Sequence, residues 1–157
     1  MKRIQPDFIN NLGIGAFACF SLLEFCGLIE YIFRNILIIN KTDSIMILWL
    51  PEIVSLIIFV FLIVWLINKF NHPTEIDPRK VLIKLIGMFF GIITLQFLFT
   101  YFGTDYLMEK YPTEFDSYID KRKGNYELQG YIAFIPILKY VIFGIILLGK
   151  KTVANNV

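Results

Sequence analysis

The sequence has few of the residues on which metal centres and common catalytic sites are built. Its 157 residues include one histidine, His72, and two cysteines, Cys19 and Cys26. A single histidine excludes a two-histidine haem site and a multi-histidine metal site within one chain. The sequence also has no CxxC pair, no glycine-rich phosphate loop and no GxSxG motif. We therefore expect a protein that is not an enzyme and that has no metal and no cofactor.

Charge is scarce as well. Charged residues make up 18% of the chain, against about 25% in an ordinary soluble domain. The net charge is +2 and there is no basic stripe, so no nucleic-acid partner is expected. Cys19 and Cys26 are separated by roughly 10 Å of helical rise. That distance is too long for a disulfide, and we expect both to be small packing residues.

What the sequence does have is long hydrophobic runs, at about residues 12–39, 45–67, 81–102 and 130–148. Each approaches or exceeds the roughly 20 helical residues that cross a bilayer core. The run VSLIIFVFLIVWLI shows no alternation of the kind a barrel strand would need. These runs predict an all-α polytopic membrane protein, with residues 1–157 forming a single four-helix transmembrane bundle. We expect the first run to be an uncleaved helix, because Asp7, Asn10 and Asn11 interrupt any signal-like segment.

Between the third and fourth runs, residues 103–129 form the only substantial connection. Its segment PTEFDSYIDKRKG, residues 112–124, predicts a short amphipathic helix, with acids in the first turn, bases in the last and a terminal glycine. We expect this helix to lie at the membrane surface and to present a recognition surface made of Phe115, Tyr118, Lys121, Arg122 and Lys123.

An even number of spans places both chain ends on one side of the membrane. With the ends inside, the inner segments hold seven lysines and arginines, including Lys2, Arg3, Lys150 and Lys151, and the outer segments hold five. This small excess favours cytoplasmic termini and an outward-facing connection 103–129.

The hydrophobic runs contain several charged residues that require explanation. Glu24 lies near the centre of the first run and Lys139 at the midpoint of the fourth. A lone charge at that depth costs from about 2.5 to more than 10 kcal/mol, so we predict that these two form an ion pair, within one chain or between subunits. Glu30 and Arg34 are four residues apart and are predicted to pair on one helix face.

Two interpretations of the polar residues remain open. They hold the helices in register, or they form a proton- or ion-responsive site. In either case, an outer polar layer that lines a cavity is expected to contain Glu30, Arg34, Glu52 and Gln96.

Helix packing gives a second pattern. Gly87 and Gly91 form a small-xxx-small pair that favours close helix–helix approach, and we expect some of the small-residue faces to pack against another chain. Pro136, three residues before Lys139, is predicted to kink the fourth span near its middle and to serve as a hinge.

The leading hypothesis is a non-enzymatic subunit of a bacterial inner membrane, surrounded by lipids and assembled as a homo-oligomer or with a protein partner, for example a cytoplasmic one. The usage of Ile, Phe, Lys and Asn indicates an AT-rich bacterial gene, which favours a sensor or effector of the phage-defence or immunity type. The alternative is a small ion channel or proton-coupled transporter that uses Glu24, Glu52 and Lys139. A toxin-binding immunity protein without flux of its own is a third possibility.

Overall fold

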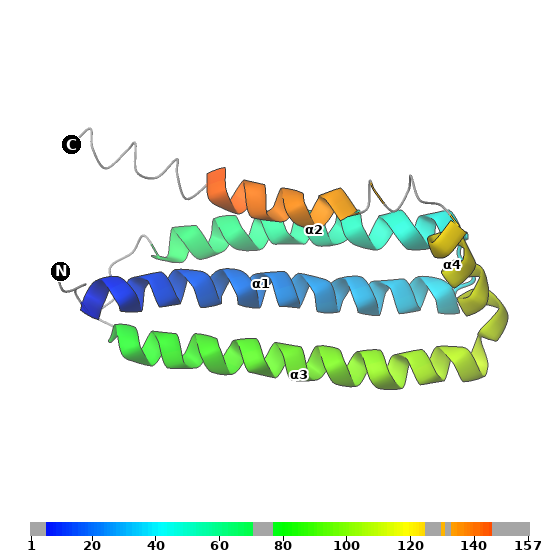
Figure 1. The fold of residues 1–157 in the computed structure, drawn as a ribbon, viewed down its shortest axis with the longest axis horizontal. Coiled ribbons are helices and arrows are strands. Elements are labelled where there is room, and N and C mark those ends of the chain that lie inside the picture. The colour runs from blue at the N-terminus through cyan, green and yellow to red at the C-terminus, as the bar shows by residue number, and fades with distance from the viewer. Residues whose placement is uncertain (1–5, 71–76, 125–129, 131–132, 146–157) are drawn as a thin grey trace.

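The computed structural model describes residues 6–70, 77–124, 130 and 133–145, and every element in these ranges is a helix (Figure 1). The elements are α1 (Pro6–Ile39), α2 (Ser44–Phe70), α3 (Pro78–Lys110), α4 (Pro112–Gly124) and an unlabelled fifth helix, Ala133–Ile145. The prediction of an all-α fold is confirmed for this part of the chain. His72 and four charges of the orientation argument lie outside the described residues: Lys2, Arg3, Lys150 and Lys151.

Three helices are long and apolar enough to cross a membrane: Leu12–Ile39, Ser44–Leu66 and Pro78–Lys110. They correspond to the first three predicted spans. The fourth predicted span, 130–148, is described at residue 130 and as the shorter apolar helix Ala133–Ile145. Residues 131–132 and 146–148 of that prediction lie outside the described residues.

The third helix is longer than the sequence analysis predicted. Residues 103–110, expected to begin a connection, continue α3 as helix to Lys110, and Leu107 in this part is buried. The helix ends where Tyr111 leaves the helical region, with φ −135° and ψ 48°. Pro112 follows directly, and the residue before a proline is disfavoured in the α conformation. The proline, and not the polarity of the segment, therefore sets this boundary.

α1 is the central helix of the fold. It packs against both α2 and α3, and the three lie side by side in Figure 1 with α1 in the middle. α1 and α3 run in the same direction, with α2 and the fifth helix opposite to them. The α1–α3 contact keeps one register. The pairs Gly13–Leu82, Gly27–Gln96 and Tyr31–Thr100 all have the same sequence offset of 69 residues.

Two apolar clusters hold the helices together. One joins α1 and α2 through Leu22, Cys26, Phe59 and Ile63, with Phe143 of the fifth helix packed against it. The other lies at the end of the molecule that carries α4, and its buried members come from four helices: Ile38, Ile47, Leu48, Leu107 and Tyr118. The fifth helix therefore contacts both α1 and α2, and α4 covers one end of the long helices (Figure 1).

The predicted helix at residues 112–124 is confirmed with the expected bounds, but its apolar face does not form an outward recognition surface. Tyr118 is 4% exposed and Phe115 packs against the same buried cluster. Lys121, Arg122 and Lys123 are exposed. Burying the aromatic side chains against the other helices removes more apolar surface from water than leaving them outward would. The prediction was wrong for Phe115 and Tyr118, and only the three cations remain exposed.

Polar contacts also attach α4 to the turn between α1 and α2. The Lys41 ammonium lies 2.9 Å from the Glu114 carboxylate. The hydroxyls of Ser44 and Ser117 are hydrogen-bonded at 2.9 Å. Lys41 has a positive φ of 55°, which is uncommon for a residue other than glycine. This backbone conformation of the turn sets the direction of the Lys41 side chain. α4 is therefore fixed on the polar side as well as on the apolar side.

Glycines of α3 differ in what surrounds them. A Cβ at Gly103 would lie 2.9 Å from the Asn35 amide and 3.0 Å from the Tyr31 hydroxyl. A Cβ at Gly87 or Gly91 would have no described atom of another element within 4 Å. Within the chain, the close approach of α1 and α3 therefore occurs at Gly103, and the predicted small-xxx-small pair faces no described neighbour.

We predict that Gly103→Leu lowers the stability of the protein in detergent by about 1–3 kcal/mol, because the added side chain overpacks the contact with Tyr31 and Asn35. The matched variant Gly91→Leu adds the same side chain to open space within the chain. Measured in excess detergent that keeps both proteins monomeric, its thermal midpoint should equal or exceed that of the wild type. Equal midpoints for the two variants would show that α1 and α3 do not approach closely at Gly103.

The pKa of Glu114 lies below its usual value because Lys41 donates a hydrogen bond to it, and the pKa of Lys41 is raised by the same bond. The contact is therefore complete above the unfolded pKa of Glu114, and it is lost as the pH falls through the lowered folded value. At high pH it is lost as the pH rises through the raised pKa of Lys41.

We predict that Lys41→Met raises the pKa of Glu114, measured by NMR titration of its side-chain carboxyl carbon. Lys110→Met is the control, since Lys110 pairs with Glu109. A Glu114 titration that is the same in Lys41→Met and in the wild type would contradict the contact.

Candidate functional site: a buried charge network beneath α4

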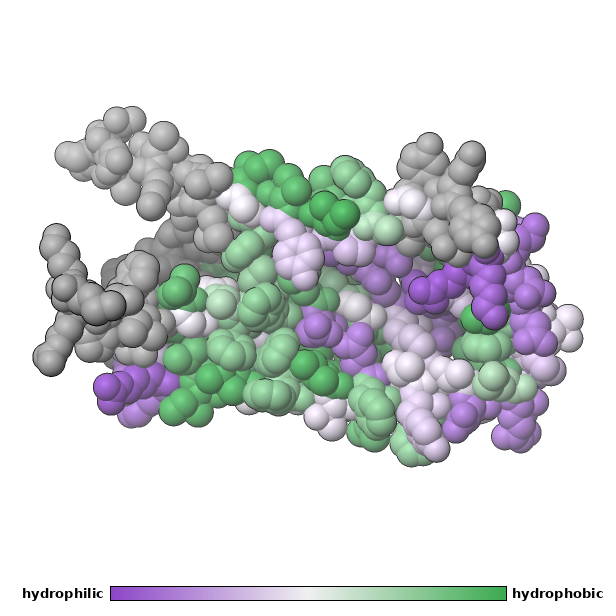
Figure 2. All heavy atoms as spheres, viewed as in Figure 1, coloured by the Kyte–Doolittle hydropathy of each residue, from purple (hydrophilic) through white to green (hydrophobic). Residues whose placement is uncertain are grey.

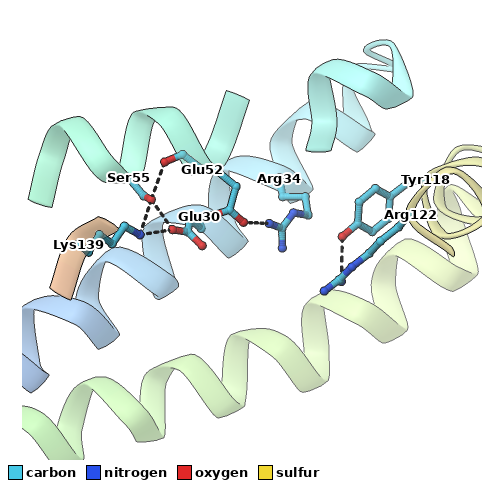
Figure 3. Close-up of polar contacts among 7 residues, drawn as sticks. All are labelled: Glu30, Arg34, Glu52, Ser55, Tyr118, Arg122 and Lys139. Carbon is cyan, nitrogen blue, oxygen red and sulfur yellow. Dashed lines mark hydrogen bonds and ion pairs between the residues drawn. The ribbon is translucent and has the colours of Figure 1, made fainter. Parts of the chain in front are cut away.

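Lys139 is the centre of the candidate site. The residue is 4% exposed, and its ammonium lies 2.6 Å from the Glu30 carboxylate of α1 and 2.8 Å from the Ser55 hydroxyl of α2. Ser55 is also hydrogen-bonded to the Glu30 carboxylate and lies 2.9 Å from the carbonyl of Glu52. One ammonium therefore connects three helices (Figure 3).

A second ion pair continues the network towards α4. Arg34 of α1 donates a hydrogen bond of 3.2 Å to Glu52 of α2. The guanidinium carbon of Arg34 also lies 5.9 Å from the centre of the Tyr118 ring, within the range of a cation–π interaction. Arg122 in turn donates to the Tyr118 hydroxyl at 3.2 Å. Figure 3 shows these side chains following one another from Lys139 to α4.

The inner part of the network is balanced in charge. Two cations, Lys139 and Arg34, face two carboxylates, Glu30 and Glu52. Removing one partner of such a buried pair leaves an uncompensated charge, which typically destabilises a protein by about 3–5 kcal/mol. The four residues therefore form one unit.

The structure corrects both ion pairs predicted from the sequence. Lys139 pairs with Glu30 and not with Glu24, and Arg34 pairs with Glu52 and not with Glu30. Glu24 has no hydrogen bond or ion pair to any other described residue. Glu24 and Glu30 are separated by about 9 Å of helical rise. Placing Lys139 at the midpoint of a span was not accurate enough to decide between them.

The remaining predicted site residues fall in different places. Gln96 lies on α3 against α1, with its amide nitrogen 3.3 Å from the position of a Cβ on Gly27, and no hydrogen bond joins it to the described part of the network. Pro136 lies in the first turn of the helix Ala133–Ile145, at the end near α4. There it lines a cavity. Its predicted function as a hinge stays a prediction.

Ser55 was missed by the sequence analysis. It is fully buried and contacts both Lys139 and Glu30. The only signal in the sequence is a single hydroxyl three residues after Glu52 in an otherwise apolar run. A small residue at this position leaves room for the long lysine side chain, and its hydroxyl accepts a hydrogen bond from the ammonium.

Two cavities flank the junction of the network with α4. One, of about 530 Å³, is lined by residues that include Arg34, Glu52 and Arg122. The other, of about 290 Å³, lies on the side of Tyr31 and Thr104. Both include Arg34, Tyr118, Ile119 and Arg122 in their walls. Within the described residues, two buried polar atoms of this region have no hydrogen-bond partner: Nε of Arg34 and Oε2 of Glu52.

No protein-family model, no curated protein and no solved structure matches this chain. The described residues contain no group of three His, Cys, Asp or Glu side chains that would hold a metal ion. The polar groups that the described residues bring to the site are its ion pairs, its hydroxyls and the two unpartnered atoms.

A double-mutant cycle tests the corrected pairing. We predict that Lys139→Met and Glu30→Gln each destabilise the protein, by up to about 3–5 kcal/mol, because each leaves the other partner buried without its counter-charge. The double variant should recover much of that loss, measured by unfolding in mixed micelles. The matched cycle of Lys139→Met with Glu24→Gln should be additive. Coupling to Glu24 in place of Glu30 would contradict the structure.

Proposed function

We propose that this chain is a non-enzymatic, multi-pass subunit of a bacterial inner membrane that acts as a sensor or effector, with α4 as its responsive element. The observation that carries the proposal is the double contact of Arg34. This side chain is bonded to Glu52 in the buried network and also lies against Tyr118 of α4. A displacement of α4 would therefore remove a cation–π contact from a residue whose charge is part of the buried balance.

The distribution of apolar surface supports a membrane location. Large hydrophobic side chains are exposed along α3, including Phe90, Phe97 and Phe102, and such a continuous apolar surface is unusual for a soluble monomer. Figure 2 shows hydrophobic residues over much of the face in view. Hydrophilic residues gather at the α4 end, with smaller groups in the middle and at the opposite end. We propose that the membrane covers the helices, that the termini are cytoplasmic and that α4 lies at the opposite surface.

The same face of α3 supports assembly. Leu107 is the one buried residue of α3, all of which is described, and Gly87 and Gly91 lie in open space. A small-xxx-small pair with no neighbour in its own chain allows a second helix to approach closely. We propose a homo-oligomer formed through this face. Native mass spectrometry should show that Gly91→Leu, placed above in open space, shifts the mass to a smaller assembly.

The alternative function is an ion channel or a proton-coupled transporter. Buried ionisable residues within apolar helices often belong to transport paths. Lys139 and Glu52 are buried, Glu30 is paired with Lys139, and Glu52 lines a cavity. In this hypothesis Glu30 replaces Glu24 in the path. Flux into liposomes that is lost in Glu30→Gln, with the fold retained, would favour transport over sensing.

The response of α4 can be measured directly. With Cys19 and Cys26 replaced by alanine, spin labels at Asp120 of α4 and Ile45 of α2 report the distance between the two helices. We predict that Tyr118→Leu gives a longer and broader distance distribution, because it keeps an apolar side chain but removes the ring beneath Arg34. Tyr118→Phe keeps the ring and should give the wild-type distribution. Identical distributions in all three proteins would show that α4 is held independently of Arg34, which would overturn the proposed coupling.

A further inference from the structure

The cavity of about 530 Å³ has an unusual combination of side chains. Three cations, Arg34, Arg122 and Lys123, line it together with one carboxylate, Glu52. Apolar side chains, among them Leu48 and Ile119, form another part of the wall. The half-open cavity therefore offers several positive groups, one negative group and an apolar surface within one volume.

The two unpartnered atoms indicate what a ligand must supply. The Glu52 side chain is 8% exposed, and its Oε1 is bonded to Arg34 while Oε2 has no partner among the described residues. Nε of Arg34 is a buried donor without an acceptor. A buried polar group without a hydrogen bond is destabilising, and more so when it is charged. Arg34 and Glu52 both line the cavity. A complementary ligand therefore carries a hydrogen-bond donor for the Glu52 carboxylate and an anionic acceptor for the arginines.

The position of the cavity narrows the class of ligand. It lies at the end of the molecule where α1 ends at Ile39 and α2 begins at Ser44, which is the level of the lipid headgroups in the proposed membrane placement. Guanidinium groups bind phosphate oxygens through parallel hydrogen bonds. A phosphodiester near Arg34 and Arg122 would place its substituent towards Glu52, and the apolar wall would contact the start of the acyl chains.

We propose that this cavity binds the headgroup of an aminophospholipid, a phosphodiester that carries a primary ammonium. The phosphate is held by Arg34, Arg122 and Lys123, and the ammonium donates to the carboxylate of Glu52. The inference deepens the proposed function and rests on its membrane placement, because it names the ligand to which α4 responds. Binding itself does not require α4 to move.

The test uses the full-length protein, purified in detergent and freed of lipid. Native mass spectrometry measures its binding of phosphatidylethanolamine, phosphatidylcholine and phosphatidylglycerol with identical acyl chains. Phosphatidylcholine has the same phosphate and a positive charge but no N–H donor, and phosphatidylglycerol has the phosphate without an ammonium. We expect phosphatidylethanolamine to bind roughly tenfold more tightly than phosphatidylcholine, the ratio that one charge-assisted hydrogen bond supplies.

Two variants locate the contacts. Glu52→Gln should bring the affinity for phosphatidylethanolamine down to that for phosphatidylcholine. Arg122→Gln combined with Lys123→Gln should weaken the binding of all three lipids, and it keeps the test usable if Glu52→Gln does not fold. Lys121→Gln is the control, because Lys121 is exposed on the same helix and does not line this cavity.

Each outcome decides the inference. Equal affinity for the ethanolamine and choline lipids, or tighter binding of phosphatidylglycerol, would overturn it. Soluble phosphoethanolamine that competes at the same concentration as the lipid would show a site for a free phosphate ester and not for a membrane lipid. Selective lipid binding with no change in the spin-label distances would leave the site standing and overturn the sensor function. If the spin-label distances respond to Tyr118→Leu but lipid binding is not selective, the proposed coupling of α4 stands and the lipid site is overturned.

Discussion

The burial of the Lys139 ammonium is the constraint on which the arrangement of the helices depends. An isolated ammonium with so little exposure would be very unfavourable, and it becomes tolerable only where a carboxylate and a hydroxyl both reach it. Glu30 comes from α1 and Ser55 from α2, so the fifth helix must lie against both helices at one axial position. The apolar contact of Phe143 with the α1–α2 cluster allows this packing but does not select the axial position. The ion pair selects it.

The two sides of α1 use different means of packing. Towards α2 and the fifth helix, α1 presents the carboxylate of Glu30 and the guanidinium of Arg34, and the specificity comes from paired charges. Towards α3 it presents Gly13, which meets Leu82, and Tyr31, whose hydroxyl lies against Gly103. This second contact is made by shape and by hydrogen bonds of neutral groups. It leaves the outer face of α3 without neighbours among the described residues, and this is the face that we propose for assembly.

The sequence predicts the presence of the helices and most of their limits, because these follow from local chemistry; the end of α3 at Lys110 is the exception. The apolar runs define α1 and α2, the Asp77–Pro78 pair begins α3, and Pro112 and Gly124 bound α4. It does not predict which charges meet. Glu24 and Glu30 lie on the same apolar helix, and the choice between them depends on how far the fifth helix slides along α1, which no local pattern records. The prediction that Phe115 and Tyr118 face outward is wrong for a similar reason, because it also depends on how helices pack and not on local sequence. An amphipathic face shows that a helix covers something apolar, but lipid and protein satisfy it equally.

The small size of α4 explains why the network and this helix should behave as one unit. α4 has 13 residues, a length at which an isolated helix is only marginally stable in water. Its helical form therefore depends on the contacts of Tyr118, Phe115 and Glu114 with the rest of the chain. Arg34 contributes to this docking only while its guanidinium lies over the Tyr118 ring, a position that its ion pair with Glu52 maintains. A ligand that binds Arg34 and Glu52 thus acts on the same groups that hold α4, and it can change the docking of the helix through Arg34 as well as through its direct contacts with α4.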